Sequence, residues 1–126
     1  MKQIINTVNA PAPIGPYNQA IRMGNLLFVS GQIGLNPQTG ELVLESIEAE
    51  TEQVLQNVKV ILEAAGTDLQ NVLKATVFVK DINQFGRINA VYEQYFQPEF
   101  APARELVQVA ELPRFANVEI SVIASV

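Results

Sequence analysis

Hydrophobic and polar residues alternate along several short stretches of this chain, which is the pattern of β-strands. Residues 19–23 and 26–33 alternate in this way on either side of a Gly-Asn pair, which predicts an antiparallel hairpin closed by a tight turn. Gly31 interrupts the second of these strands. A glycine at that place indicates a β-bulge, or a position where another group approaches the backbone closely.

Two other stretches carry apolar residues at steps of three and four, as amphipathic helices do. The first begins after Ser46, a good N-cap residue, and ends at Gly66. The second spans residues 84–96 and is capped by Asp81 or Asn83.

The last two strands contain the residues of greatest chemical interest. Arg104 opens one of them, and Glu119 lies inside the other. A further strand is predicted over residues 73–80, before the second helix. A turn over residues 113–117 predicts that these last two strands pair with each other. A guanidinium and a carboxylate in otherwise apolar strands indicate either a structural ion pair or a functional site.

The order of these elements predicts an α+β fold, with one mixed sheet and two helices packed on one of its faces, in a single domain over residues 1–126. The other face stays open, and alternation places apolar side chains on it: Leu26, Phe28, Phe78, Leu106 and Ala110. So much apolar surface predicts association with further copies through the open face. Arg104 and Glu119 would then lie near a subunit boundary, where a desolvated cleft can form.

The composition limits the available chemistry. The 126 residues include no cysteine and no histidine, which excludes disulfides, thiolate nucleophiles, Ser-His-Asp relays and His-ligated zinc or haem. Eight basic residues against 13 acidic ones give a net charge of −5, and the basic residues are scattered, which disfavours a nucleic-acid surface. The polar, proline-rich start and the lack of a long apolar run predict a soluble cytoplasmic protein without a membrane segment.

Several polar residues have more than one interpretation. Prolines and a glycine over residues 11–16 predict a rigid loop that ends in Tyr17, which either lies over a cleft or packs the loop onto the core. Asn89 is interpreted as a residue that satisfies a loop backbone. The acids near the start of the first helix are interpreted as a solvated face and not as a metal site, because a spacing of two cannot converge on one ion: Glu48, Glu50 and Glu52.

Seven segments of the sequence together resemble the reactive intermediate deaminase family, Rid or YjgF. They are PIGPYNQA at 13–20, VSGQIGLNPQTGEL at 29–42, QVLQNVKVILEAAG at 53–66, KATVFVKDINQF at 74–85, INAVYEQYF at 88–96, PAR at 102–104 and VEI at 118–120. The similarity runs through nearly the whole chain in one order.

This resemblance implies a chorismate-mutase-like fold and a homotrimer with three clefts at the subunit interfaces. It implies hydrolysis of reactive 2-imino acids and their enamine tautomers, such as 2-iminobutanoate and 2-iminopropanoate, to 2-keto acids and ammonia without a cofactor. The family's carboxylate-binding arginine matches Arg104, and its water-positioning glutamate matches Glu119. Tyr17 matches the aromatic residue over the substrate, and Gly31 and Leu106 match backbone contacts in the cleft.

Two positions depart from the family pattern. Position 106 is Leu where many members have Cys or Ser, which excludes a thiol-dependent role but leaves the implied backbone contact possible. Glu105 directly follows the arginine. Alternation points the Glu105 side chain away from Arg104, whereas a carboxylate on the same side would repel an anionic substrate.

Two other functions remain open. A trimer with the same Arg104 clamp could bind 2-keto acids or other small carboxylic acids as a regulatory protein without catalysing a reaction. Relatives are also described as ribonucleases or translation inhibitors, a function that the acidic net charge and the lack of histidine disfavour in this chain.

Overall fold

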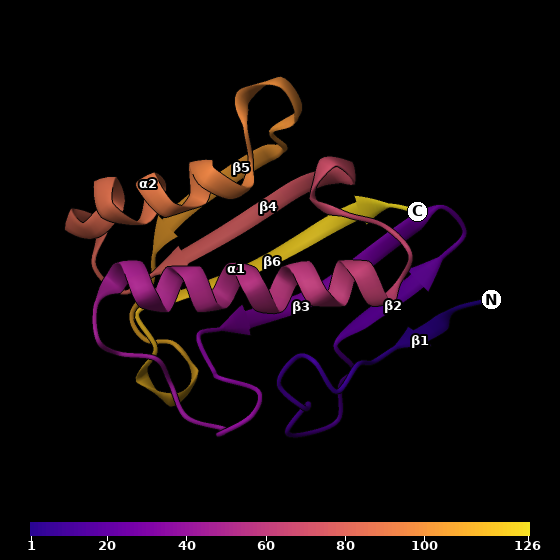
Figure 1. Ribbon diagram of the computed structural model, residues 1–126, viewed down its shortest axis with the longest axis horizontal. Helices are drawn as coiled ribbons and strands as arrows, with labels where there is room; N and C mark the ends of the chain where they lie inside the picture. The colour runs from indigo at the N-terminus through magenta and orange to yellow at the C-terminus, as the bar shows by residue number, and fades with distance from the viewer.

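The computed structural model describes residues 1–126 as one six-stranded sheet with two helices against one of its faces (Figure 1). The strands are β1 (Gln3–Ile5), β2 (Ala20–Met23), β3 (Leu26–Ile33), β4 (Val72–Val79), β5 (Ala103–Gln108) and β6 (Val118–Ser125). The helices are α1 (Ile47–Ala64) and α2 (Phe85–Tyr95), with short 3-10 turns η1 (Leu69–Asn71), η2 (Ile82–Gln84), η3 (Pro98–Phe100) and η4 (Pro113–Phe115). The predicted α+β fold is confirmed, and neither helix is long and apolar enough to cross a membrane.

The sheet is mixed, with the strand order β1-β2-β3-β6-β4-β5, and only β4 and β5 run parallel. The predicted pairing of the last two strands is wrong, because β4 lies between β5 and β6. The physical reason is the connection through α2, which returns the chain to the starting end of β4 and thereby sets β5 parallel to it. β6 then pairs antiparallel on the other side of β4.

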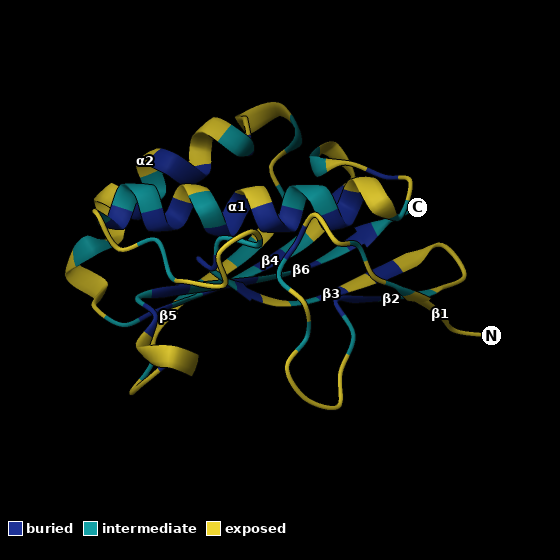
Figure 2. Ribbon diagram, turned by 60° about the horizontal axis from the view of Figure 1, so that its bottom comes forward, coloured by how far each residue is buried: buried dark blue, intermediate teal, exposed yellow.

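The core lies between the helices and the covered face of the sheet. α1 begins as predicted, since the Ser46 hydroxyl accepts a hydrogen bond from the Ala49 amide at 3.0 Å. The buried positions of α1 turn toward the sheet (Figure 2), and its fully buried apolar side chains are Val54, Leu55, Val58, Ile61 and Leu62. They pack with the alternate strand residues that share this face, among them Val77 and Ile120.

The start of the second helix differs from the prediction. The Asp81 carboxylate accepts a hydrogen bond from the Asn83 amide at 2.9 Å, so Asp81 caps the 3-10 turn η2. α2 begins afterwards at Phe85 and has no side-chain cap. A separate turn therefore brings α2 over β5.

The open face carries apolar side chains, but not all of those predicted. Leu26 and Phe28 are 40% and 44% exposed there, as expected. Leu106 is instead paired with Val77 and packs against the core, and Val107 takes its place on the open face. The parallel register of β5 with β4 causes this change, because it aligns alternate residues of β5 with the covered face. Ala110 lies beyond the end of β5 and is exposed.

β3 is interrupted at Gly31, as predicted. Its register with β6 shifts between Val29 and Gln32, so the intervening residues form a bulge. A Cβ atom on Gly31 would lie 2.8 Å from the Cδ atom of Glu119. The glycine thus allows the Glu119 carboxylate to lie directly against the backbone of β3.

Glu50 corrects the prediction that the acids of α1 form a solvated face. It is only 1% exposed, and its carboxylate accepts hydrogen bonds from the amide and the side chain of Asn117 at 2.7 and 2.8 Å. Asn117 lies two residues before Glu119 in the chain. Gly34 makes room for this contact, because a Cβ there would lie 3.0 Å from the Glu50 carbonyl oxygen. The first turn of α1 therefore fixes the start of β6.

We expect alanine to be tolerated differently at the two tightly packed glycines. Gly34→Ala should lower the free energy of unfolding by about 2 kcal/mol, because the α1 backbone cannot withdraw from the new methyl group. Gly31→Ala should cost less, because the nearest atoms belong to the end of the Glu119 side chain, which can rotate away. Chemical denaturation of both variants measures the difference, and equal losses would contradict this account of the packing.

Candidate functional site

Three of the predicted site residues meet in one pocket. Tyr17, Gly31 and Glu119 line a cavity of about 260 Å³ beneath the proline-rich loop. The wall also includes Arg114, the side-chain amides of Gln19 and Gln32, and a set of apolar neighbours: Pro11, Ala12, Ile14, Ile33, Leu35 and Pro113. The cavity therefore combines one carboxylate, one guanidinium and two side-chain amides with several apolar neighbours.

Glu119 is the chemically most distinctive group of this pocket. Its side chain is half-buried on the open side of the sheet, between the buried residues Val118 and Ile120. It forms no hydrogen bond or ion pair within the chain. Burial raises the pKa of the Glu119 carboxyl above its ordinary value, because desolvation disfavours the charged form. A carboxylate without a partner is available to accept a proton.

Tyr17 is held over the pocket by a network around Gln19, a buried residue that sequence reasoning missed. The Gln19 side-chain amide donates hydrogen bonds to the carbonyl oxygens of Thr7 and Pro11 at 3.0 and 2.9 Å. Its oxygen accepts one from the Thr7 amide at 2.6 Å. Ser30 in the bulge of β3 donates to the Asn18 carbonyl oxygen at 2.7 Å. Tyr17 is 50% exposed, so it does not serve as a core anchor for the loop.

Arg104 lies apart from this pocket, between β5 and α2. Its guanidinium is 4.6 Å from the ring centroid of Tyr92 and 5.8 Å from that of Phe85. Its Nη1 atom donates a hydrogen bond to Asn89 Oδ1 at 2.8 Å. Asn89 thus contacts Arg104, which corrects the prediction that it satisfies a loop backbone. The other guanidinium N–H groups have no acceptor in the chain and can bind a carboxylate.

Tyr92 beside Arg104 also has unused bonding capacity. It is 6% exposed, and its buried hydroxyl has no hydrogen-bond partner in the chain. Burial raises the pKa of Tyr92 to about 12, although the Arg104 charge partly opposes this shift. The hydroxyl therefore stays protonated at neutral pH.

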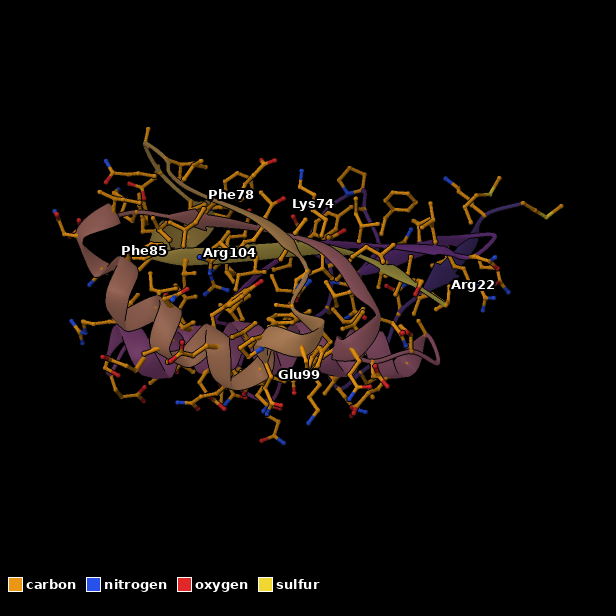
Figure 3. The ribbon with its side chains drawn as sticks, turned by 90° about the horizontal axis from the view of Figure 1, so that it is seen from above. Arg22, Lys74, Phe78, Phe85, Glu99 and Arg104 are labelled. Carbon is orange, nitrogen blue, oxygen red and sulfur yellow. The ribbon has the colours of Figure 1, made fainter.

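Arg104 and Glu119 lie on opposite faces of the sheet. Arg104 is level with Ala75 on the covered face, whereas Glu119 is level with Phe78 on the open face. Figure 3 shows Phe78, the neighbour of Glu119 in the sheet, on the open side and Arg104 on the helix side. One chain therefore cannot bring the Arg104 guanidinium and the Glu119 carboxylate onto one small substrate.

Glu105 points away from Arg104, as predicted. Its carboxylate lies on the open face and pairs with Lys74 at 2.7 Å. It is therefore not placed to repel an anion bound at Arg104. Leu106 lies on the same face as Arg104, with its side chain against the core, so only its backbone is available to a ligand. No cluster of acidic side chains forms a metal site.

Comparisons with known proteins identify the family. The family model described as endoribonuclease L-PSP matches residues 7–126. A RutC family protein of Pyrococcus horikoshii is 53% identical over 98% of each chain, and a bovine (Bos taurus) protein named 2-iminobutanoate/2-iminopropanoate deaminase is 49% identical over 98% of this chain and 90% of its own length. The solved structure of E. coli TdcF with bound serine superposes with a TM-score of 0.93 at 44% identity, covering 98% of each chain. The chain belongs to the Rid/YjgF/RutC family, whose model carries the description endoribonuclease L-PSP.

Proposed function

We propose that this protein hydrolyses reactive 2-imino acids, with 2-iminobutanoate and 2-iminopropanoate as substrates, to 2-keto acids and ammonia. The observation that carries this proposal is the unpartnered, half-buried Glu119 carboxylate beneath Tyr17 and against Gly31. The name of the bovine relative supports the reaction, and the serine bound to TdcF supports a small amino-acid-like ligand.

Arg104 supplies the second half of the proposed site. A guanidinium offers two parallel N–H donors to a carboxylate, which fixes both the position and the plane of an imino acid. Asn89 and Tyr92 hold the guanidinium from α2 and leave N–H groups free for the substrate. The backbones of Gly31 and Leu106 provide further polar contacts in this proposal.

The chemistry requires no group that the chain lacks. A protonated imine is electrophilic at C2, so a positioned water molecule can attack it once its proton has an acceptor. The Glu119 carboxylate takes that proton and the new C–O bond forms. The protonated Glu119 then gives its proton to the nitrogen of the tetrahedral carbinolamine. As the C–N bond breaks, the hydroxyl proton returns to the Glu119 carboxylate, the C=O bond of the 2-keto acid forms, and ammonia leaves and takes up that proton. Holding both reactants in place supplies much of the rate increase.

The separation of the two half-sites supports clefts between copies. The open face carries Leu26, Phe28 and Val107, each at least 40% exposed, and this surface favours self-association. Arg104 lies on the edge strand β5, where a neighbouring copy can approach. We propose a homotrimer in which Arg104 of one copy and Glu119 of the next share a cleft.

A non-catalytic protein that binds 2-keto acids is the alternative, because the Arg104 half-site alone suits a carboxylate. Ribonuclease activity, which the family model's description names, is disfavoured by the absence of histidine and by the scattered basic residues.

Variants of the two charged residues test the proposed roles. Glu119→Ala should lower kcat/KM for 2-iminobutanoate by about a hundredfold or more and largely keep 2-oxobutanoate binding, because only the proton acceptor is lost. Arg104→Ala should abolish both. The assay follows imine decay after a threonine dehydratase forms the imine, and calorimetry follows 2-oxobutanoate binding. Binding without hydrolysis by the unaltered protein would favour the sensor, and full activity in either variant would reject these roles.

Mixing the two inactive variants tests where the site forms. Light scattering should give a mass near three chains. Subunit exchange between equal amounts of Arg104→Ala and Glu119→Ala proteins should restore about a quarter of the wild-type clefts. A cleft is intact only when its Arg104 comes from a Glu119→Ala copy and its Glu119 comes from an Arg104→Ala copy. Each variant exchanged with itself is the control. A stable monomer, or no recovery after proven exchange, would contradict clefts between copies.

The pH dependence follows from the burial of Glu119. The carboxyl must be ionised to accept a proton. Because its pKa is raised, acidification should abolish activity at a pH above the ordinary glutamate pKa of about 4.3. Activity should therefore rise as pH increases through this raised pKa. Glu119→Gln should remove this fall in activity at low pH, the acid limb, from the pH profile of the residual rate. Glu99→Gln, on the exposed turn η3, should leave the acid limb in place. An acid limb that persists in Glu119→Gln would assign it to another group.

A further inference from the structure

Arg114 brings a second guanidinium to the pocket that contains Glu119. It is the only basic residue among those that line this pocket. Arg104, which we have assigned to the substrate carboxylate, comes from the other face of the sheet. The half-site around Glu119 thus carries a positive group that the hydrolysis of a simple imino acid does not use.

The backbone at Arg114 is held in a conformation that non-glycine residues rarely adopt. Arg114 and Phe115 have φ angles of 56° and 59°, in the left-handed region. The turn is kept by hydrogen bonds from the Phe115 amide to the Leu112 carbonyl oxygen at 3.0 Å and from the Ala116 amide to that of Pro113 at 3.2 Å. Two consecutive residues in this costly conformation indicate that the path of the turn is important for placing Arg114 at the pocket.

The Arg114 guanidinium keeps most of its bonding capacity. Its Nη1 atom donates to the Gly40 carbonyl oxygen at 3.1 Å, which orients the side chain without neutralising it. The three ion pairs of the chain join Lys74 to Glu105, Lys80 to Glu111 and Arg87 to Glu48, so Arg114 takes part in none. Its remaining N–H groups can receive a carboxylate.

We propose that Arg114 binds a second carboxylate, at the side-chain end of the substrate, and that the site therefore favours 2-imino dicarboxylic acids of four or five carbons. This inference rests on the proposed function, in which Arg104 holds the first carboxylate. Water adds at C2 and ammonia leaves, so the products are a 2-keto dicarboxylic acid and ammonia. Arg114 takes no part in these bond changes and acts as a specificity residue.

A pair of substrates of equal length tests this role. Amino-acid oxidases with catalase form 2-iminoglutarate from glutamate and 2-iminopentanoate from 2-aminopentanoate, and semicarbazide traps the imine that escapes hydrolysis. Arg114→Gln should lower kcat/KM for 2-iminoglutarate about tenfold more than for 2-iminopentanoate, because a charged hydrogen bond is lost only with the diacid. Arg22→Gln is the matched control, since Arg22 also bonds one backbone carbonyl oxygen, at 3.1 Å, and lies far from Arg104 on β2 (Figure 3).

Calorimetry with 2-oxoglutarate and 2-oxopentanoate gives a second measurement that does not depend on turnover. Arg114→Gln should weaken 2-oxoglutarate binding about tenfold more than 2-oxopentanoate binding, and Arg22→Gln should not change this ratio. If the protein hydrolyses neither imine yet shows this selective loss, the proposed reaction fails and the role of Arg114 stands. If hydrolysis proceeds and Arg114→Gln changes both substrates equally or neither, the role of Arg114 is overturned.

Discussion

Two helices cover only one face of this six-stranded sheet, and the positions of the candidate site residues depend on that constraint. In a strand, a residue next to buried neighbours must point to the opposite face. Val118 and Ile120 are buried under the helices, so Glu119 is directed to the open face. β5 aligns Arg104 with buried Ala75, which directs the guanidinium under α2. A register slip of one residue would place a charged group in the wrong layer and an apolar one in water.

Local features of the fold were predictable because short segments of sequence determine them. The hairpin of β2 and β3, the bulge at Gly31 and the Ser46 cap each follow from neighbouring residues. The pairing of β5 with β6 was predicted wrongly, because the partner of a strand depends on how the intervening helix returns the chain. The burial of Glu50 was missed for a similar reason, since its two hydrogen-bond donors come from Asn117, on a distant segment.

The candidate site shows the same limit. Its single residues could be selected from motifs, but their division between two faces could not, because it follows from the position of β4 between β5 and β6. Gln19 and Asn89 gave no signal beyond being polar residues near apolar ones. Each organises a neighbour through long-range hydrogen bonds, Gln19 for the loop of Tyr17 and Asn89 for Arg104. Such contacts have no periodic pattern along the chain.

The Lys74–Glu105 pair gives the open face a property that its apolar residues alone do not. Each of the two charges already has its counterion on the same chain, at 2.7 Å, before any other molecule approaches. Because its two charges balance, this pair neither repels an identical surface nor requires an oppositely charged one. The pair therefore adds no net electrostatic repulsion to contact between open faces, and added salt would change its contribution to that contact little.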